Sequence, residues 1–442
     1  MRVVLFTGKG GVGKTTTAAA CAVRAARSGT RTLVLSTDAA HSLGDTLGCD
    51  LGGRLGPVAL EQGLHALQVG SRRAGDSSWR IVQDYLLEVL DTLGVDPLLS
   101  EELTSLPGVD EVAALLELRA RAESGQWDLV VVDCAPTAET LRLLVLPEAL
   151  AWHLERVLPA QPGLLRTLRP AAAAAAGIPL PSAEVARTLT AWYRQMREVH
   201  AMLTGPLASI RLVLTPERVV VAEARRMWTS LSLYGFAVDG LVVNRVVPDA
   251  VPGQANTRGA DPWLRSWNEA QQAALIEVEE SFTGLPVVRV PYLPREPIGG
   301  EALDSLAASL AGDGDDADPF GVRSPVRDRG LTVRRANTGY LLTLPLPLVR
   351  AGDVDLKRRE DELLLTVGDH RRVLSLPSVL RRCIVRDARV EEGALQVAFE
   401  PDPSLWPAAL DAVPEPEADQ EPLATPRTAR HRKARSRESA HG

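Results

Sequence analysis

A glycine-rich segment near the start of the chain constrains the fold more than any other feature. Residues 8–15 read GKGGVGKT, which matches the phosphate-loop pattern G-x-x-x-x-G-K-[ST]. An apolar run over Arg2–Phe6 precedes the loop, and an alanine-rich stretch over Thr15–Arg27 follows it. A strand, a glycine loop and the N-terminus of a helix, in that order, form the unit in which backbone N–H groups bind phosphate. We therefore predict a phosphate-binding turn between a buried strand and a helix.

The residues of this loop have separate expected roles. Lys14 should reach the β- and γ-phosphates, and Thr15 should hold Mg²⁺. Lys9 and Lys14 are two of only four lysines in the chain, which favours compact ammonium groups that serve phosphate. The expected nucleotide contacts come from Gly8, Gly10, Gly11, Val12, Gly13, Lys14, Thr15 and Thr16.

Composition limits the classes of protein that the chain can be. Its 442 residues suffice for two domains, and a net charge of -7 gives no reason to expect specific nucleic-acid binding. No apolar run approaches the ~20 residues of a membrane-spanning helix. The first apolar run meets the loop by residue 8, which leaves no room for a signal peptide. We expect a cytoplasmic protein.

The cysteines do not form a recognisable ligand or disulfide pattern. They are scattered and contain no C-x-x-C pair: Cys21, Cys49, Cys134 and Cys383. We therefore expect neither a disulfide framework nor a zinc site.

Apolar runs alternate with helical stretches through the N-terminal part of the chain. The further runs are Arg31–Leu35, Leu129–Val132, Ile210–Leu214, Leu241–Val243 and Val287–Val290. This alternation predicts an α/β fold with a doubly wound, mostly parallel sheet between two layers of helices. Ligands bind such sheets at the carboxyl ends of the strands. Polar residues stand at three of these ends, in Ser36–Asp38, at Asp133 and in Asn244–Arg245.

Composition also divides the rest of the chain. We predict that the α/β domain spans 1–311, with a proline-containing helical insertion over 150–205. Residues 312–330 are rich in Asp, Gly and Pro, which predicts a linker. Apolar alternation with period two over 331–401 predicts a small all-β sandwich. Residues 402–442 are rich in Pro, Glu and Ala and then basic, which is typical of a disordered tail.

Three segments, in this order, resemble those of the ArsA ATPase family: Gly8–Thr16, Ser36–Leu43 and Asp133–Arg142. That family includes the arsenite-pump ATPases and the ATPase that delivers tail-anchored membrane proteins. The resemblance covers residues 1 to about 310. It implies a P-loop NTPase fold, hydrolysis of the γ-phosphate, and ATP and Mg²⁺ as cofactors.

The resemblance also implies roles for individual residues. Lys9 would reach across a homodimer interface to the partner's nucleotide, and Asp38 would orient the attacking water. These two and Lys14 form the implied catalytic set. Asp133 would support Mg²⁺ through a water, and Asn244 would contact the adenine edge. Asp38 as a helix N-cap and Asn244 as a turn residue remain as alternatives.

The chain departs from the family pattern in both switch segments. Ala39 stands where the family commonly has proline, and Ala138–Glu139 stands where it commonly has Gly-His. The second segment couples hydrolysis to the distant partner site in the family, so we expect altered coupling but intact hydrolysis. The family's arsenite-binding cysteines and its zinc-binding C-x-x-C pair have no evident match here.

The β module resembles the small heat-shock (α-crystallin-type) domain that some prokaryotic ArsA-like proteins carry. The matching segments are Leu344–Pro347, Ser375–Pro377 and Glu392–Val397. Client holding, a dimer contact and a purely structural role all remain open for this module. The insertion's candidates for a client groove, or else for ordinary core, are Leu154, Val157, Leu158, Leu164, Leu165, Leu168, Met196, Val199 and Met202.

The leading hypothesis is a homodimeric, Mg²⁺-dependent ATPase whose closing and opening binds and releases a protein partner, including a membrane-protein client. One alternative is the ATPase subunit of an anion or metalloid exporter of the arsenite type. Another is a positioning switch like MinD or ParA, which share the two-lysine loop. Membrane contact, through the basic tail, is expected to be transient.

Overall fold

We analysed a computed structural model of the chain. It describes residues 1–38, 42–52, 56–69, 81, 84–85, 109–135, 144–145, 182–248, 262–310, 330–336 and 339–406. Four sequence predictions lie wholly or mostly outside these residues. They concern the second switch beyond Ala135, the insertion before Ser182, the linker and the tail after Trp406.

An eight-stranded sheet forms the centre of the N-terminal domain, in the order β3-β4-β2-β5-β1-β6-β7-β8. The strands are β1 (Arg2–Thr7), β2 (Thr32–Ser36), β3 (Val58–Glu61), β4 (Leu64–Gln68), β5 (Leu129–Asp133), β6 (Ala208–Leu214), β7 (Val238–Val246) and β8 (Val287–Pro291). All neighbours pair in parallel except β3, which runs antiparallel to β4 at one edge. The predicted mostly parallel α/β sheet is confirmed, and the β3–β4 hairpin adds an edge that the apolar pattern did not indicate.

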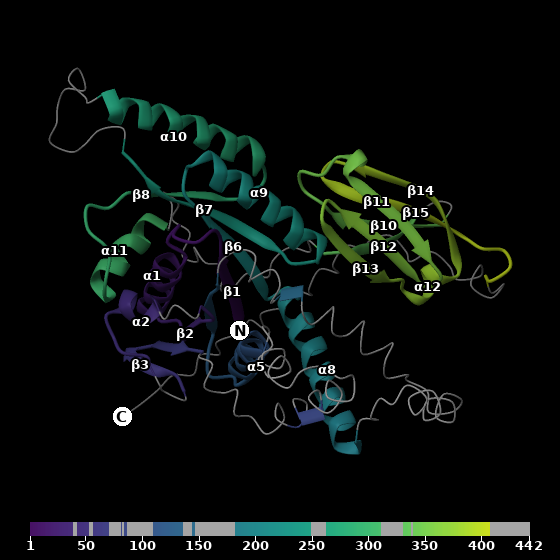
Figure 1. The fold of residues 1–442 in the computed structure, drawn as a ribbon, viewed down its shortest axis with the longest axis horizontal. Coiled ribbons are helices and arrows are strands. Elements are labelled where there is room, and N and C mark those ends of the chain that lie inside the picture. The colour runs from purple at the N-terminus through teal and green to yellow at the C-terminus, as the bar shows by residue number, and fades with distance from the viewer. Residues whose placement is uncertain are drawn as a thin grey trace, which may run out of the picture.

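Helices cover both faces of this sheet (Figure 1). They are α1 (Lys14–Arg27), α2 (Ser42–Leu47), α5 (Val109–Glu123), α8 (Ala183–Leu203), α9 (Arg218–Leu233), α10 (Pro262–Ser281) and α11 (Gly300–Leu310). Helix α1 packs against α11 and the central strands, α5 packs against α8, and α9 packs against α10. The alanines of α1, such as Ala18, Ala19 and Ala22, are fully buried, so this helix lies close to the sheet. That close packing holds the loop before α1 at the end of β1.

The C-terminal domain is a separate antiparallel β-sandwich, as predicted (Figure 1). One sheet has the order β14-β15-β10-β9 and the other β11-β12-β13. Its elements are β9 (Thr332–Ala336), β10 (Gly339–Pro345), the 3₁₀ turn η3 (Ala351–Asp353), β11 (Val354–Arg359), β12 (Glu362–Val367), β13 (His370–Ser375), α12 (Ser378–Arg381), β14 (Cys383–Glu391) and β15 (Ala394–Pro401). Alternate residues of β12 and β15 are buried, so the period-two pattern marks the faces that meet in the sandwich.

The sandwich docks on the C-terminal end of α9. The Thr229 hydroxyl donates a hydrogen bond to the Pro347 carbonyl at 2.9 Å, and the Tyr234 hydroxyl donates to the Arg371 carbonyl at 3.2 Å. The Arg372 guanidinium donates in turn to the last carbonyl of α9, that of Leu233. The end of helix α9 therefore carries hydrogen bonds between the two domains.

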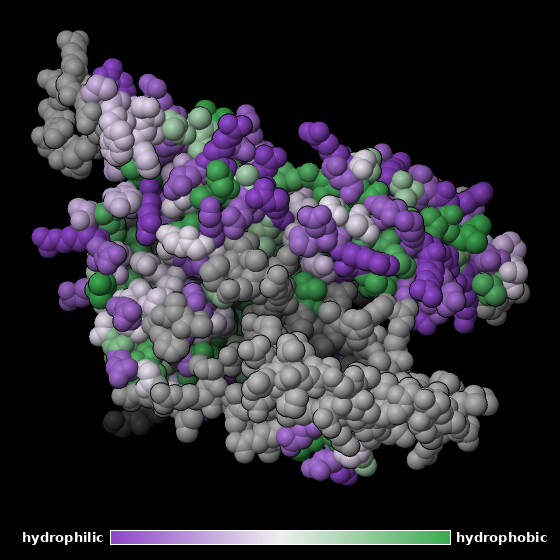
Figure 2. Space-filling model, in the orientation of Figure 1, coloured by the Kyte–Doolittle hydropathy of each residue, from purple (hydrophilic) through white to green (hydrophobic). Residues whose placement is uncertain are grey.

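Two of the candidate groove residues on α8, Met196 and Val199, are buried in the core, so these two residues do not line an open groove. Among the described residues, no helix combines the length and the apolar character needed to cross a membrane. On the face shown in Figure 2, hydrophilic residues occupy much of the coloured surface, and hydrophobic residues form smaller areas between them.

Candidate active site

The loop between β1 and α1 depends on glycine at two positions where a Cβ would clash. A Cβ on Gly8 would lie 2.0 Å from the Val213 carbonyl oxygen of β6. Gly13 has a φ of +92°, and a Cβ there would lie 2.3 Å from Nδ2 of Asn244. Gly10, by contrast, would meet nothing within 4 Å, so one side of the loop is open. The loop is thus tightly seated on β6 and β7 and open where an anion would bind.

The two lysines of the loop lie in different environments. The side chain of Lys14 is buried, and its Nζ donates a long hydrogen bond of 3.4 Å to the Lys9 carbonyl inside the loop. The side chain of Lys9 is 42% exposed, and its Nζ lies 3.9 Å from Oε2 of Glu223 on α9. One ammonium group therefore points into the phosphate cradle, and the other lies outside it.

Asp133 stands at the carboxyl end of β5, between the ends of β1 and β2. In the sheet register it pairs with Phe6 of β1 and Ser36 of β2. Its Oδ2 accepts a hydrogen bond of 3.1 Å from the Ser36 hydroxyl. Its Oδ1 is buried and accepts no hydrogen bond from the residues that the structure describes. A buried acceptor without a partner is costly, and it indicates a place for a water or a hydrated ion.

The ionisation of Asp133 reports on its neighbours. Burial raises the pKa of Asp133 from 3.8 to about 6, and this effect outweighs all others. The nearby hydroxyls of Thr15 and Ser36 and the charge of Lys14 lower the pKa, while the charge of Asp38 raises it. The predicted residues Lys14, Thr15, Asp38 and Asp133 therefore lie close enough to influence one another.

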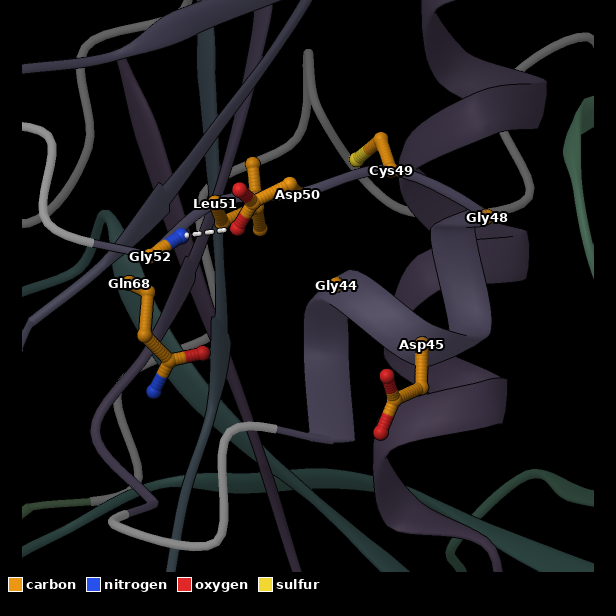
Figure 3. A pocket seen from close by; sticks show the side chains of 8 residues that line it. All are labelled: Gly44, Asp45, Gly48, Cys49, Asp50, Leu51, Gly52 and Gln68. Atoms are coloured by element: carbon orange, nitrogen blue, oxygen red, sulfur yellow. Dashed lines mark hydrogen bonds between the residues drawn. The ribbon is translucent and has the colours of Figure 1, made fainter.

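The backbone of Asp38 is held from both sides. Its amide N–H donates to the Ser36 hydroxyl at 3.2 Å, and its carbonyl accepts a hydrogen bond of 2.8 Å from Nε2 of Gln68. Gln68 ends β4 and also lines a cavity of about 560 Å³ beside α2. Figure 3 shows this cavity, with the Gln68 amide on one side and Asp45 of α2 on the other. Two neighbouring strand ends thus fix the start of the first switch segment.

Asn244 braces the loop from the end of β7. Its Nδ2 donates to the Val12 carbonyl at 2.9 Å, and its Oδ1 accepts from the Arg245 amide at 2.9 Å. Arg245 has a φ of +58°, a strained conformation that this local hydrogen bond supports. The adenine contact of Asn244 stays a prediction. The structure adds a bracing role that the sequence did not indicate.

A cavity of about 240 Å³ adjoins Asn244. Its lining includes Gly13, Thr16, Asn244 and the Pro291–Leu293 segment that follows β8. Tyr292 is more than half exposed there, and its amide donates to the Val246 carbonyl at 2.8 Å.

The oxygen atoms of Thr15 and Asp133 fit Mg²⁺. The Thr15 hydroxyl lies at the start of α1, 3.2 Å from the Ser42 hydroxyl, and Asp133 contributes the unpartnered Oδ1. Mg²⁺ prefers oxygen ligands, keeps several waters and takes few protein ligands beside phosphates. In the described part of the chain, His, Cys, Asp and Glu form no group of three or more that could hold a metal. A site of one hydroxyl and one carboxylate acting through water matches the P-loop arrangement.

Two residues of the site were missed by the sequence reasoning. Gln68 ends the strand β4 just as Asp133 ends β5, so a search for polar residues after every apolar run would have found it. Glu223 lies within α9 and has no sequence signal that marks it as a partner of Lys9. The first switch beyond Asp38, residues 39–41, lies outside the described residues.

Comparisons with known proteins agree with this geometry. The model of the anion-transporting ATPase family matches residues 1–312, and the model of the HSP20-like domain found in ArsA matches residues 337–399. An uncharacterized protein of Streptomyces coelicolor is 40% identical over 411 residues, which are 92% of this chain and 99% of the relative.

Two further relatives carry functional names. A protein of Prosthecochloris vibrioformis, provisionally named an arsenical pump-driving ATPase, is 34% identical over 404 residues, 90% of this chain and 96% of its own length. The ATPase get3 of Schizosaccharomyces pombe is 28% identical over 317 residues, 70% of this chain and 91% of its own length. Since the family model covers most of the chain, and the loop has the geometry that the motif requires, the chain belongs to the ArsA family of ATPases and carries that family's HSP20-like domain.

Proposed function

We propose that this ATPase hydrolyses ATP with Mg²⁺ as a homodimer, and that its nucleotide-driven closing and opening binds and releases a protein partner. The proposed partner class is a membrane-protein client, as the resemblance to the tail-anchored-protein ATPase implies. The observation that carries the proposal is the separation of the two loop lysines, with Lys14 buried in the loop and Lys9 exposed outside it. An exposed lysine beside a phosphate loop is suited to a nucleotide on a second subunit.

The residues of one subunit would bind and orient the nucleotide. The N–H groups of the loop and the N-terminus of α1 hold the phosphates, and Lys14 neutralises charge on the β- and γ-phosphates. Asp38, whose backbone is held by Ser36 and Gln68, accepts a hydrogen bond from the attacking water. Phosphoryl transfer needs this positioning and charge neutralisation more than covalent catalysis.

Thr15 and Asp133 would hold Mg²⁺, Thr15 directly and Asp133 through a water on its Oδ1. The ion held by these two residues would supply positive charge that neutralises the phosphates. The partner subunit's Lys9 then adds the remaining positive charge, in the way that an arginine finger does. Because this lysine comes from the other subunit, hydrolysis requires the closed dimer.

Lysine substitutions test this arrangement. Lys14→Ala should abolish turnover, since it removes the buried phosphate ligand. Lys9→Ala should leave binding of a fluorescent ATP analogue largely intact and lower turnover by roughly 10²-fold or more. Lys357→Ala is the matched control, because this lysine is exposed on β11 and pairs only locally with Asp355 at 2.7 Å. Normal turnover in Lys9→Ala would overturn the proposed role of Lys9.

Partner binding needs a separate experiment. Asp38→Asn in ATP and Mg²⁺ should accumulate the closed form, and Lys14→Ala should stay empty. We predict that proteins with apolar membrane segments are retained by the Asp38→Asn variant and not by the Lys14→Ala variant. If neither variant retains such proteins, the client proposal fails while the ATPase proposal stands.

A second candidate is the ATPase subunit of a metalloid exporter, which the name of the Prosthecochloris relative favours. The cysteines give it little support. Cys21, Cys134 and Cys383 are buried, and burial raises the pKa of the Cys21 thiol to about 12, which makes it a poor ligand. Stimulation of turnover by antimonite would favour the exporter, and unchanged turnover would count against it.

A further inference from the structure

Lys9 is held by its own subunit in this structure. Its Nζ lies 3.9 Å from Oε2 of Glu223, which α9 presents one turn after the exposed Val219. The Lys9 side chain is 42% exposed and that of Glu223 is 28% exposed, so solvent reaches both groups. The pair is therefore an interaction that can open without disturbing the core.

We propose that Glu223 is a positioning residue that keeps Lys9 on its own subunit until the nucleotide of a second copy of the chain competes for it. The inference rests on the proposed function, in which Lys9 acts across the dimer. Glu223 would then set how readily the dimer closes. It would not take part in the reaction itself.

The charges of Glu223 and of the ATP phosphates explain why Lys9 leaves the first for the second. A carboxylate offers Lys9 one negative charge, whereas the phosphates of ATP offer several. Attraction to the phosphates is therefore stronger once they come within reach. Before closure, the ammonium group of Lys9 lies 3.9 Å from the Glu223 carboxylate on α9. Lys9 is thus less available for an unproductive contact within one subunit.

The exposure of the pair limits the size of the effect. Solvent screens partly exposed ion pairs, and each such pair changes an equilibrium by a small factor, roughly 1.5-fold to 5-fold. Closure of a symmetric dimer opens two such pairs, so loss of Glu223 should ease closure by the square of this factor, roughly 2-fold to 25-fold. The sign is the distinctive part of the proposal, because removing a residue near the active site is expected to strengthen association of the dimer.

Glu223→Gln is the direct test, since Gln has nearly the helix propensity of Glu and α9 should stay intact. Glu277→Gln is the matched control. Glu277 lies on α10, is 31% exposed and pairs at 3.0 Å with Arg225, which like Glu223 belongs to α9. It does not contact Lys9. Turnover of the full-length protein is measured at saturating ATP over a range of protein concentrations, and ATP-dependent association is measured by sedimentation.

For Glu223→Gln we expect half-maximal turnover at a protein concentration roughly 2-fold to 25-fold lower than for the parent protein, because each dimer loses two pairs. Maximal turnover should be unchanged, and Glu277→Gln should match the parent protein. In a Lys9→Ala background, Glu223→Gln should no longer change association, because its effect acts through Lys9. A lower maximal turnover, a higher midpoint, or an equal effect without Lys9 would each overturn the proposal.

The same data separate this inference from the proposed function. If turnover of the parent protein does not depend on protein concentration, the trans-acting role of Lys9 fails. If the parent protein depends on concentration and Glu223→Gln behaves identically to it, only the role of Glu223 fails.

Discussion

The buried carboxyl group of Asp133 should make the nucleotide-free protein less stable when it is ionised. Burial raises its pKa from 3.8 to about 6, so the folded chain keeps a proton that the unfolded chain has already released. The stability associated with this proton is complete below pH 3.8 and is lost as the pH rises through about 6. At about 1.4 kcal/mol for each pH unit, the ionised group costs about 3 kcal/mol at pH 8.

Asp133→Asn removes this cost and keeps an oxygen that can accept the Ser36 hydrogen bond. We predict that the free energy of unfolding of the α/β domain rises by up to about 3 kcal/mol at pH 8, which corresponds to a Tm increase of about 6 °C. At pH 4.5 the gain should shrink to roughly 1 kcal/mol. Turnover should fall, because the carboxylate proposed to support Mg²⁺ is lost.

The assay is thermal unfolding between pH 4.5 and 8, without nucleotide and with a chelator present. Ligand-free conditions matter because a bound nucleotide or ion would stabilise the folded state of the parent protein more than that of the variant. An unchanged or lower Tm at pH 8 would refute the reasoning. So would a gain that is equally large at pH 4.5.

Three further substitutions test the scaffold of the site. Gly13→Ala should disrupt the loop and abolish nucleotide binding, because its φ is +92° and the new Cβ would lie 2.3 Å from Asn244; normal binding in an equilibrium titration would contradict this. Asn244→Ala should lower the free energy of unfolding by about 1–2 kcal/mol and weaken nucleotide binding, since the Val12 carbonyl loses its buried donor. Denaturant unfolding measures the first effect and the same titration measures the second, and wild-type values would contradict the prediction. Tyr234→Phe removes the hydrogen bond to the Arg371 carbonyl and should lower stability by about 1 kcal/mol without changing maximal turnover; calorimetry and a turnover assay check this, and a large loss of turnover would indicate that the sandwich acts on the active site.

The sequence predicts well those strands whose burial follows one regular pattern from end to end. The strands β1, β2, β5 and β6 are buried on both faces, so they read as continuous apolar runs. In β12 and β15 the two faces differ, and the alternation of apolar residues marks them. In both kinds of strand, the order of apolar and polar residues matches the pattern of burial.

Of the strands that the sequence reasoning missed, β3, β9 and β14 lie at sheet edges, whereas β4 lies between β3 and β2. β9 and β14 are the edge strands of one sheet of the sandwich, and most of their residues are exposed. Charged side chains on an edge strand protect it from pairing with other chains, but they also remove the apolar pattern. The short β3 at the edge of the large sheet is partly exposed for the same reason and was missed with it.

The candidate site divides in a similar way. The phosphate loop is a local structure, so its glycines and Lys14 are recognisable from spacing alone. Asp133 is recognisable as the residue that ends a buried strand. The bracing role of Asn244 and the contact between Lys9 and Glu223 each join segments more than 200 positions apart, and only the folded arrangement brings them together. Sequence spacing carries no information about such pairs.

Mixing two inactive variants tests the central claim, that Lys9 serves the nucleotide of the other subunit. Lys9→Ala and Asp38→Asn should each be nearly inactive alone. In a mixed dimer, the subunit with Lys9→Ala keeps Asp38 and receives Lys9 from its partner, so one complete site forms. The account predicts that an equal mixture recovers about a quarter of the parental turnover, as random pairing into symmetric dimers requires. If Lys9 acts within its own subunit, neither site is complete, and a mixture as inactive as its two components would contradict the account.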